Sequence, residues 1–566
     1  MTLEEKAAQM ALVEKNSITP GNAGYAGVGG VLSGAGAKPE DNTPEGWRDM
    51  VARYMEESRS SRLGIPLLYG LDAVHGHGNV PGATLFPHSI GLGAANDPEL
   101  TRRVAEATAE EVRASGVFWS FSPNLDMPQD IRWGRVYEGF SSDAQVTADL
   151  GAAYIRGLQG EGNTPAMLAT AKHYLGTGGM QWGTAVNPDY RIDQGTTQAS
   201  EEVIREFYLP PFRAAVEQGA LSVMVGLNTI DGKKMSANKH LITDVLKGEL
   251  GFRGFVVSDW YGVYEIGGGE YAATVAAINA GVDMVMLPFE YKPFVQNVVA
   301  AVQNGDISEA RVNDAVRRIL YAKFVVGLFD NSAPSNLDVI GADARRALAR
   351  EAVARSLVLL KNENVLPLFR SPTLRRIAVA GSAADNTGRQ SGAWTIEWQG
   401  IDGNAIPGAT SILAGIRSAA GPEMEILYDA AGDFDLPEDS ADIGIAVVGE
   451  GPYAEGVGDN PYPSLSAEDL QAIEGLRKVS GEVVVVIVSG RPLFIQKELP
   501  KWDALVAAWL PGSEGAGVAD VLFGKRSFSG TLPLPWPASI RQLPFTPSGR
   551  TADGAMPLFP RGFGLR

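Results

Sequence analysis

Cysteine is absent from this 566-residue chain. Its absence excludes thiol nucleophiles, disulfide bonds and thiolate metal ligands. Histidine is scarce as well, with five in all. His75 and His77 are close in sequence, but they sit beside glycines and no third ligand converges on them. We therefore expect no metal site.

Basic residues are also fewer than acidic ones. The chain has 48 Lys and Arg and 66 Asp and Glu, which give a formal net charge of -18. Such a chain repels phosphate-rich partners, so we expect neither nucleic acid nor a membrane as partner. No apolar run is long enough to span a bilayer. The start, MTLEEKAAQM, lacks the basic and apolar regions of a secretory signal, and Thr2 and Glu5 instead predict a capped helix. The sequence does not decide the cellular compartment. A cytoplasmic location is favoured over secretion followed by removal of a signal peptide.

The chain is too long for one hydrophobic core, because single cores stop growing at about 250–300 residues. Residues 1–330 alternate short apolar segments with amphipathic ones, such as the helix predicted between Asp97 and Gly116. This alternation predicts a (β/α)8 TIM-like barrel. Because only seven of its eight strands can be assigned, we expect part of the barrel to be irregular. The seven predicted strands are 29–34, 65–72, 116–124, 167–175, 221–228, 254–260 and 282–288.

Residues 331–346 are rich in Pro, Ser and Asn, which predicts a linker. A second alternation follows in residues 347–566 and predicts a smaller α/β sandwich with a helix at 466–479. Its predicted strands are 375–382, 424–430, 443–450, 482–490 and 504–512. The glycine-rich stretch 21–30 has loose dinucleotide-like spacing but lacks the required order of strand, helix and distal acid, so we expect no cofactor.

Polar residues recur where the predicted barrel strands end, which is where barrel enzymes carry their active sites. Each has a plain alternative: Arg132 can pair with Asp130 or Glu138, and His173 can be a buried core histidine. The recurrence of such polar residues at the ends of several predicted strands favours a functional site at the barrel rim. The residues concerned are Asp72, Lys172, His173, Asn228, Asp259 and Trp260, with Asp130, Arg132 and Glu138 from the segment PQDIRWGRVYEG.

The second domain contributes a long loop, 447–466, with Glu450, Glu455 and Asp459. Long loops in compact domains tend to be functional or disordered, and a solvated acidic loop is the alternative here. Segment 388–403 places Trp394 and Trp398 in a polar, glycine-rich context. Exposed aromatics near carboxylates stack on the apolar face of sugar rings, whereas the alternative is an apolar contact between the domains.

These motifs, in order along the whole chain, resemble those of glycoside hydrolase family 3, in particular its two-domain β-glucosidases and exo-β-glucanases. The resemblance implies a barrel followed by an α/β sandwich, with the pocket between them and no cofactor. It also implies retaining hydrolysis, in which two carboxyl groups stand about 5–5.5 Å apart. The segments that carry it are YGLDAVHGHGNVPGATLFPHSIGLGA, RWGRVYEG, AKHYLG, GFVVSDW, LVLLKNENVLPL, WTIEWQG, GEGPYAEGVGDN, WLPGSEGAGVADVLFG and PLFPRGFGL.

By this resemblance Asp259 is the catalytic nucleophile and Glu455, rather than Glu450, is the acid/base. Lys172 and Arg132 would then keep the Asp259 carboxyl ionised. The resemblance further implies that the sugar is bound by Asp72, Arg132, Lys172, His173, Met224, Trp260 and Trp398, the two tryptophans clamping the next sugar along the substrate.

The implied activity is that of an exo-acting retaining β-glucosidase (EC 3.2.1.21). It would release glucose from β-linked gluco-oligosaccharides or aryl and alkyl β-glucosides through a covalent glucosyl-Asp intermediate, as a monomer or homodimer. A β-xylosidase and a catalytically weak sugar-binding relative are the alternatives. A β-N-acetylglucosaminidase is not expected, because KHYLGTGGM lacks the His-Asp pair of that branch.

Three positions depart from the family pattern. Thr177 stands where relatives have Asp, Leu227 falls where a tyrosine normally hydrogen-bonds the nucleophile, and Tyr261 replaces a residue that is often acidic. We expect Leu227 to leave Asp259 in a drier setting with fewer hydrogen bonds. These departures affect the substrate preference but remove neither catalytic carboxylate.

Overall fold

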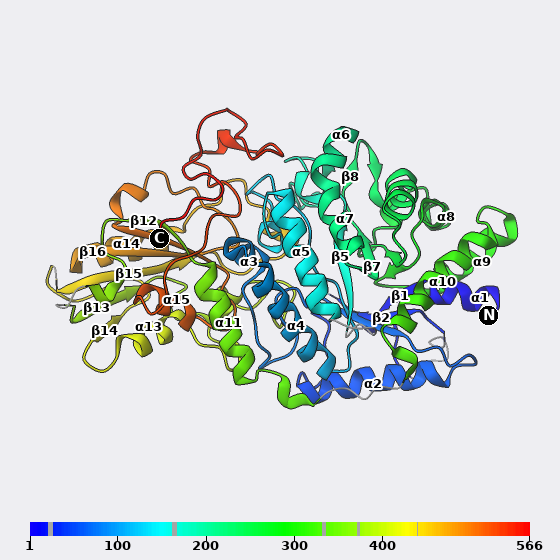
Figure 1. Ribbon diagram of the computed structural model, residues 1–566, viewed down its shortest axis with the longest axis horizontal. Coiled ribbons are helices and arrows are strands. Elements are labelled where there is room, and N and C mark those ends of the chain that lie inside the picture. The colour runs from blue at the N-terminus through cyan, green and yellow to red at the C-terminus, as the bar shows by residue number, and fades with distance from the viewer. Residues whose placement is uncertain (21–26, 35, 161–166, 331–335, 371–373, 439) are drawn as a thin grey trace. The chain divides into compact units, whose positions relative to one another are not determined.

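The computed structural model describes the chain except residues 21–26, 35, 161–166, 331–335, 371–373 and 439 (Figure 1). It divides into two compact units. The first comprises residues 1–80, 101–126 and 151–340, and the second comprises 81–100, 127–150 and 341–566. Part of the expected linker, 331–335, and part of the glycine-rich stretch, 21–26, lie outside the described residues. The domain bounds 1–330 and 347–566 stay a prediction.

The first unit contains the expected barrel. Its eight strands are all parallel and follow one another around the sheet in chain order. A parallel bridge between Val257 and Met284 joins the two ends of the sheet. The strands are buried throughout, as the near-continuous apolar runs predicted. They are β1 Ala11–Glu14, β2 Gly30–Ser33, β3 Leu68–Leu71, β4 Trp119–Ser120, β5 Leu168–Tyr174, β7 Ser222–Val225, β10 Phe255–Val257 and β11 Val285–Leu287.

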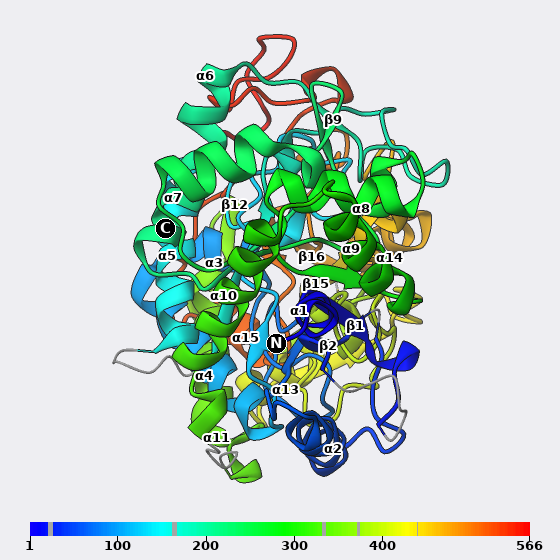
Figure 2. The same cartoon turned by 90° about the vertical axis from the view of Figure 1, so that its right-hand side faces the viewer.

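The strand missing from the sequence assignment is β1. Its four residues directly follow helix α1, Leu3–Gln9, so they are too few to show a period of their own. Figure 2 shows α1 next to β1. The predicted capping box of α1 is confirmed: the Glu5 amide donates to Thr2 Oγ1 at 3.2 Å, and the Thr2 amide donates to Glu5 Oε2 at 2.7 Å.

The segments that connect the barrel strands differ in their type of helix. Between β1 and β2 the described residues hold only the 3-10 turn Lys15–Ser17, and a π-helix, His240–Glu249, precedes β10. The helix predicted after Asp97 is α4, whose first amides are capped by the Asp97 carboxylate. The α-helices are α2 Pro44–Ser60, α4 Pro98–Ala114, α5 Ala144–Gln159, α6 Glu201–Val203, α7 Leu209–Glu217, α8 Glu270–Ala280, α9 Lys292–Asn304 and α10 Glu309–Val325. A small three-stranded sheet is formed by β6 Thr196–Thr197, β8 Thr229–Ile230 and β9 Lys233–Lys234.

The second unit contains the α/β sandwich. Its sheet has the order β12-β17-β16-β15-β13-β14, and β12 is its antiparallel edge strand. The predicted strands are all present, whereas β12 was not assigned. The strands are β12 Val358–Asn362, β13 Arg376–Ala380, β14 Glu425–Tyr428, β15 Ala441–Gly449, β16 Ser480–Val488 and β17 Ala504–Trp509. The helices are α3 Ser89–Ala95, α11 Asp343–Ser356, α12 Thr387–Ser391, α13 Ile412–Ala420, α14 Ala467–Val479 and α15 Ala516–Leu522.

The helices of this unit pack directly on its sheet. α14, the helix predicted at 466–479, begins at its N-cap Ser466 and packs on β13, β15 and β16. α3 and α11 pack on β17. Across the described part of the chain, none of the helices is both long and apolar enough to cross a bilayer.

Candidate functional site

Asp259 lies at the carboxyl end of β10. The three residues of β10 are fully buried and pair in parallel register with β7. Asp259 Oδ1 accepts the Trp260 backbone amide at 2.6 Å, while Oδ2 faces His173 Nε2 at 3.6 Å. The side chain retains 14% of its exposure. A buried strand thus holds a partly accessible carboxylate at the rim of the barrel.

His173 links Asp259 to a second carboxylate. The His173 Nδ1 atom lies 2.7 Å from Asp126 Oδ2, and both side chains are buried. Because a carboxylate accepts this bond, Nδ1 carries the proton and Nε2 is the atom directed toward Asp259. The sequence prediction gave Asp126 no role, although it follows β4 closely and the rule of strand ends applies to it equally.

Lys172, the residue before His173, pairs with Asp72. Lys172 Nζ donates to Asp72 Oδ1 at 2.6 Å, and the two residues come from the ends of β5 and β3. Lys172 is almost fully buried, whereas Asp72 keeps 16% of its side chain exposed. The cation therefore fixes and neutralises a carboxylate that can still accept hydrogen bonds from a ligand.

Trp260 packs on the loop after β2. A Cβ atom on Gly34 would lie 2.3 Å from Trp260 Cζ3, so glycine is needed for the indole to occupy this position. Trp260 remains half-buried.

Met224 is buried on β7 and pairs in register with Val257, two residues before Asp259.

Two of the departures from the family pattern lie beside these residues. Thr177 Oγ1 donates to Asn228 Oδ1 at 3.3 Å, and Asn228 Nδ2 donates to the Leu175 carbonyl at 3.1 Å. Leu227 Cδ2 would lie 2.7 Å from a Cβ atom on Gly262, which places the leucine against the turn that follows Asp259. An apolar side chain therefore packs on this turn.

Glu455 belongs to the second unit, in the 3-10 turn Glu455–Gly458. Its Oε1 atom lies 3.4 Å from Arg135 Nη1, and Arg135 also makes a bidentate pair with Glu138 at 2.8 Å for each bond. A Cβ atom on Gly134 would lie 1.8 Å from the Glu455 carbonyl oxygen, so the two backbones meet closely. Glu455 keeps 21% of its side chain exposed.

Glu450 has a different environment from Glu455. It accepts hydrogen bonds from Arg491 Nη2 at 2.8 Å, Tyr453 Oη at 2.8 Å and Ser489 Oγ at 2.7 Å. Burial opposes the charge of Arg491, but the Glu450 carboxylate outweighs it and raises the pKa of the guanidinium. Glu450 is thus engaged in holding Arg491 rather than open to a ligand.

Arg491 connects the loop of Glu455 to the segment that carries Arg132. Arg491 Nη1 donates to the Gly458 carbonyl at 2.8 Å and to the carbonyls of residues 131–133 at 3.3–3.4 Å. Arg132 makes a bidentate pair with Asp130, its Nη2 lying 2.5 Å from Asp130 Oδ2. The ion pair foreseen as the alternative for Arg132 therefore forms, in the second unit rather than in the barrel unit.

Trp398 lies on a segment bonded to the same loop. The Trp394 amide donates to the Trp398 carbonyl at 3.1 Å, and the Ala454 amide donates to Gln399 Oε1 at 2.9 Å. The side chain of Gln399, the residue after Trp398, therefore fixes the backbone of Ala454, the residue before Glu455. Trp398 itself is half-exposed.

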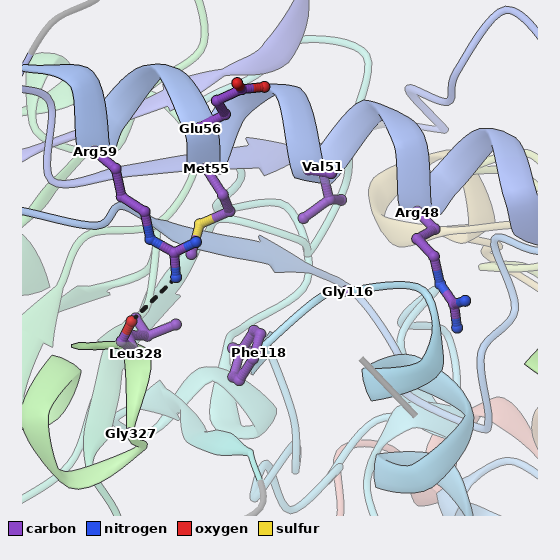
Figure 3. A pocket seen from close by; sticks show the side chains of 10 residues that line it. Arg48, Val51, Met55, Glu56, Arg59, Gly116, Phe118, Gly327 and Leu328 are labelled. Atoms are coloured by element: carbon purple, nitrogen blue, oxygen red, sulfur yellow. Dashed lines mark hydrogen bonds between the residues drawn. The ribbon is translucent and has the colours of Figure 1, made fainter. Parts of the chain in front are cut away.

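A cavity of about 360 Å³ in the first unit contains none of these residues (Figure 3). It lies between α2 and the chain that leads into β4, where Arg59 Nη2 donates to the Leu328 carbonyl at 3.4 Å. Gly116 and Phe118 line it ahead of β4, at the end of the barrel that carries the strand starts. Among the described residues there is no cluster of three or more His, Asp or Glu side chains suited to a metal ion.

Comparison with known proteins identifies the family. Residues 2–322 match the glycosyl hydrolase family 3 N terminal domain, and residues 357–566 match the family 3 C-terminal domain. The chain belongs to glycosyl hydrolase family 3. It is therefore a glycoside hydrolase, as its motifs predicted, and its barrel and sandwich are the two domains of this family.

Three relatives bear on the substrate. A lysosomal beta glucosidase of Dictyostelium discoideum is 32% identical over 92% of this chain and 67% of its own length. A beta-xylosidase of Formosa agariphila is 32% identical over 91% of this chain and 77% of its own. The crystal structure of exo-1,3/1,4-beta-glucanase from a Pseudoalteromonas species superposes with a TM-score of 0.90 at 39% identity, covering 100% of this chain and 72% of that one.

Proposed function

We propose that this family 3 enzyme is an exo-acting retaining β-glucosidase. It releases glucose from the non-reducing end of β-linked gluco-oligosaccharides and of aryl or alkyl β-glucosides. The observation that carries the proposal is the Asp259 carboxylate, held at the end of a buried strand with one oxygen toward His173. The expected monomer or homodimer and the cellular location stay predictions.

In the first step Asp259 attacks the anomeric carbon while Glu455 donates a proton to the glycosidic oxygen. The bond to the leaving group breaks, the aglycone departs as an alcohol, and a glucosyl-Asp259 ester forms. Glu455, now a carboxylate, takes a proton from water, which attacks the same carbon and releases glucose. Two inversions give net retention of the β configuration.

The contacts of the two carboxylates suit these roles. The Trp260 amide occupies Asp259 Oδ1, which leaves Oδ2, 3.6 Å from His173 Nε2, for the attack. Glu455 is the more accessible of the two candidate glutamates, and the charge of its neighbour Arg135 is already balanced by Glu138. Glu450, with three donors of its own, is less suited to exchange a proton with a substrate.

The sugar would be bound by the residues around Asp259. Asp72, fixed by Lys172, can accept hydrogen bonds from two adjacent sugar hydroxyls. His173, Arg132 and Met224 are proposed as further sugar contacts. Trp260 and Trp398 are proposed to clamp the next ring.

A β-xylosidase is the second candidate, because a relative at 32% identity carries that name. The two substrates differ by one hydroxymethyl group, and a difference of that size is worth only about 1–3 kcal/mol of discrimination. A weakly catalytic sugar-binding protein is the third candidate, supported by Thr177 and Leu227 at positions where the family carries polar partners of the reaction.

The test is a panel of 4-nitrophenyl β-glycosides: glucoside, xyloside, galactoside and N-acetylglucosaminide. We expect the glucoside to give the highest kcat/KM and Asp259→Ala to abolish nitrophenol release, while Asp189→Ala, on an exposed loop, leaves it unchanged. Proton NMR of early product should show β-glucose. A xyloside preferred by more than about tenfold would favour the second candidate. Binding without turnover would favour the third.

A further inference from the structure

Two aromatic side chains stand exposed at the ends of neighbouring barrel strands. Tyr261 comes two residues after Asp259, and Phe289 comes two residues after β11 ends at Leu287. The Val257–Met284 bridge makes β10 and β11 neighbours, so both aromatics lie on the rim that carries Asp259. Tyr261 is 39% exposed and Phe289 63%. Their ring centroids are 5.9 Å apart at an interplanar angle of 64°.

The position of Tyr261 is fixed relative to Asp259. The Gly262 amide donates to the Asp259 carbonyl at 3.1 Å, and the Tyr264 amide donates to the Tyr261 carbonyl at 3.0 Å. Tyr264 also contacts the Tyr261 ring edge-on, with centroids 5.3 Å apart. Tyr261 has a φ of +58°, a left-handed conformation that costs a non-glycine residue of order 1–2 kcal/mol. The backbone thus presents this ring outward at an energetic cost.

The two rings serve no purpose in the core, since both keep much of their surface in water. Aromatic faces at such a rim suit one kind of ligand in a glycosidase, the apolar face of a pyranose ring. Trp260, the residue between Asp259 and Tyr261, is already proposed to hold the sugar next to the scissile bond. Tyr261 follows it directly, and Phe289 extends the aromatic surface onto the next strand.

We propose that Tyr261 and Phe289 form a second leaving-group subsite, which stacks on the sugar ring one position beyond the ring held by Trp260. The occupant is a β-linked glucosyl unit of a trisaccharide or longer chain. This inference rests on the proposed β-glucosidase activity and specifies its substrate class as oligosaccharides of three or more units rather than disaccharides alone.

The test compares trimers with a substrate too short to reach the subsite. The variants are Tyr261→Asn, because Asn tolerates the left-handed backbone, Phe289→Ala and the double variant. Tyr321→Ala is the matched control, since Tyr321 is an exposed tyrosine of α10, at 45% exposure. The readout is kcat/KM for β-1,3- and β-1,4-linked glucose trimers divided by kcat/KM for 4-nitrophenyl β-glucoside.

We expect this ratio to fall about tenfold in the double variant, the size of one aromatic stacking contact, and to stay constant in Tyr321→Ala. Tyr261→Phe should retain it, because the ring is kept. An unchanged ratio in the double variant would overturn the subsite. Inactivity of the wild-type protein on every glucoside would instead overturn the proposed function.

The subsite can be tested without turnover as well. In the Asp259→Ala background, titration calorimetry with a glucose trimer should show about tenfold weaker binding once Tyr261 and Phe289 are replaced. Glucose itself should bind equally before and after the replacement. Equal trimer affinities in the two proteins would contradict the subsite whatever the catalytic outcome.

Discussion

Asp259 follows a strand of three buried residues, whereas Glu455 lies in a short turn after a loop. The strand is paired on both sides, and the position of the Asp259 carboxylate follows from its register. The turn of Glu455 is held by Gly134, Gln399 and Arg491, each far away in sequence. One carboxylate is thus placed by backbone pairing within a sheet and the other by a set of side-chain and glycine contacts. The second should be easier to displace by changes that never touch it.

The largest expected effect separates the two glutamates of that loop. Glu450→Ala leaves the buried Arg491 without its carboxylate, which should cost about 3–5 kcal/mol of unfolding free energy. Glu455→Ala, at a partly exposed site whose neighbour Arg135 keeps Glu138, should cost less than about 1 kcal/mol. Urea unfolding of both variants measures the difference. Equal losses would mean that Glu450 does not anchor the loop.

A smaller effect is expected on the Asp259 side. Asp126→Asn removes the carboxylate that orients His173, and misplacement of a reacting group by about 1 Å can lower a rate about 10²-fold. Because Asp126 acts through His173, we expect kcat to fall, KM to change little and the kcat–pH profile to shift. Asp306→Asn, at an exposed surface position, is the control. A rise in KM with kcat unchanged would indicate a binding role instead.

The two units also bury cations differently. Arg491 is paired with Glu450, whereas Lys323, fully buried on α10, donates to the neutral Gln9 Oε1 at 2.8 Å. Burial lowers the pKa of Lys323 to about 7 from 10.5. The unfolded chain therefore binds more protons than the native one between pH 7 and pH 10.5, and stability should rise with pH there, by about 1.4 kcal/mol per pH unit.

Lys323→Met tests this assignment, because methionine keeps the length of the side chain without the charge. Stability of the variant should no longer rise through this pH window, while below pH 7 it should exceed that of the wild type. Chemical denaturation at pH 6, 7, 8 and 9 gives both slopes. Parallel curves for the two proteins would show that another group titrates.

The smallest expected effect concerns Leu227, which lies against Gly262 in the turn after Asp259. Leu227→Tyr would supply the hydroxyl that the family pattern leads us to expect at this position, and one added hydrogen bond typically contributes about 0.5–1.5 kcal/mol net. We expect kcat/KM for the aryl glucoside to change by about tenfold or less. Leu227→Phe adds the ring without the hydroxyl, so a change shared by both variants would reflect packing alone.

The contrast between the strand before Asp259 and the loop of Glu455 also explains how much of the site could be predicted from the sequence. Asp72, Lys172 and Asp259 lie in or just after apolar segments that the sequence analysis assigned as strands, and these polar positions were identified from that pattern. Asp126 carried the same signal and was missed, and β1 lies so close after α1 that it gave no separate signal. Family motifs, not local pattern, singled out Glu455.

Tertiary contacts explain what the sequence did not reveal. Residues 127–150 lie between β4 and β5 in the chain, and the sequence analysis placed Arg132 at the barrel rim. The structure groups this segment with the second unit, where Arg491 binds its carbonyls and Asp459 accepts the Gly134 amide. The pairing of Arg135 with Glu455 likewise joins residues more than three hundred positions apart. No periodicity or cap signals such contacts.

The assignment of the two carboxylates is tested most directly by chemical rescue with azide. Glu455→Ala and Glu450→Ala are assayed on 2,4-dinitrophenyl β-glucoside, whose leaving group needs no proton from the enzyme. We predict that azide restores turnover of Glu455→Ala and yields β-glucosyl azide, because the small anion attacks the glucosyl-Asp259 ester without a general base. Rescue of Glu450→Ala with no response from Glu455→Ala would contradict the assignment.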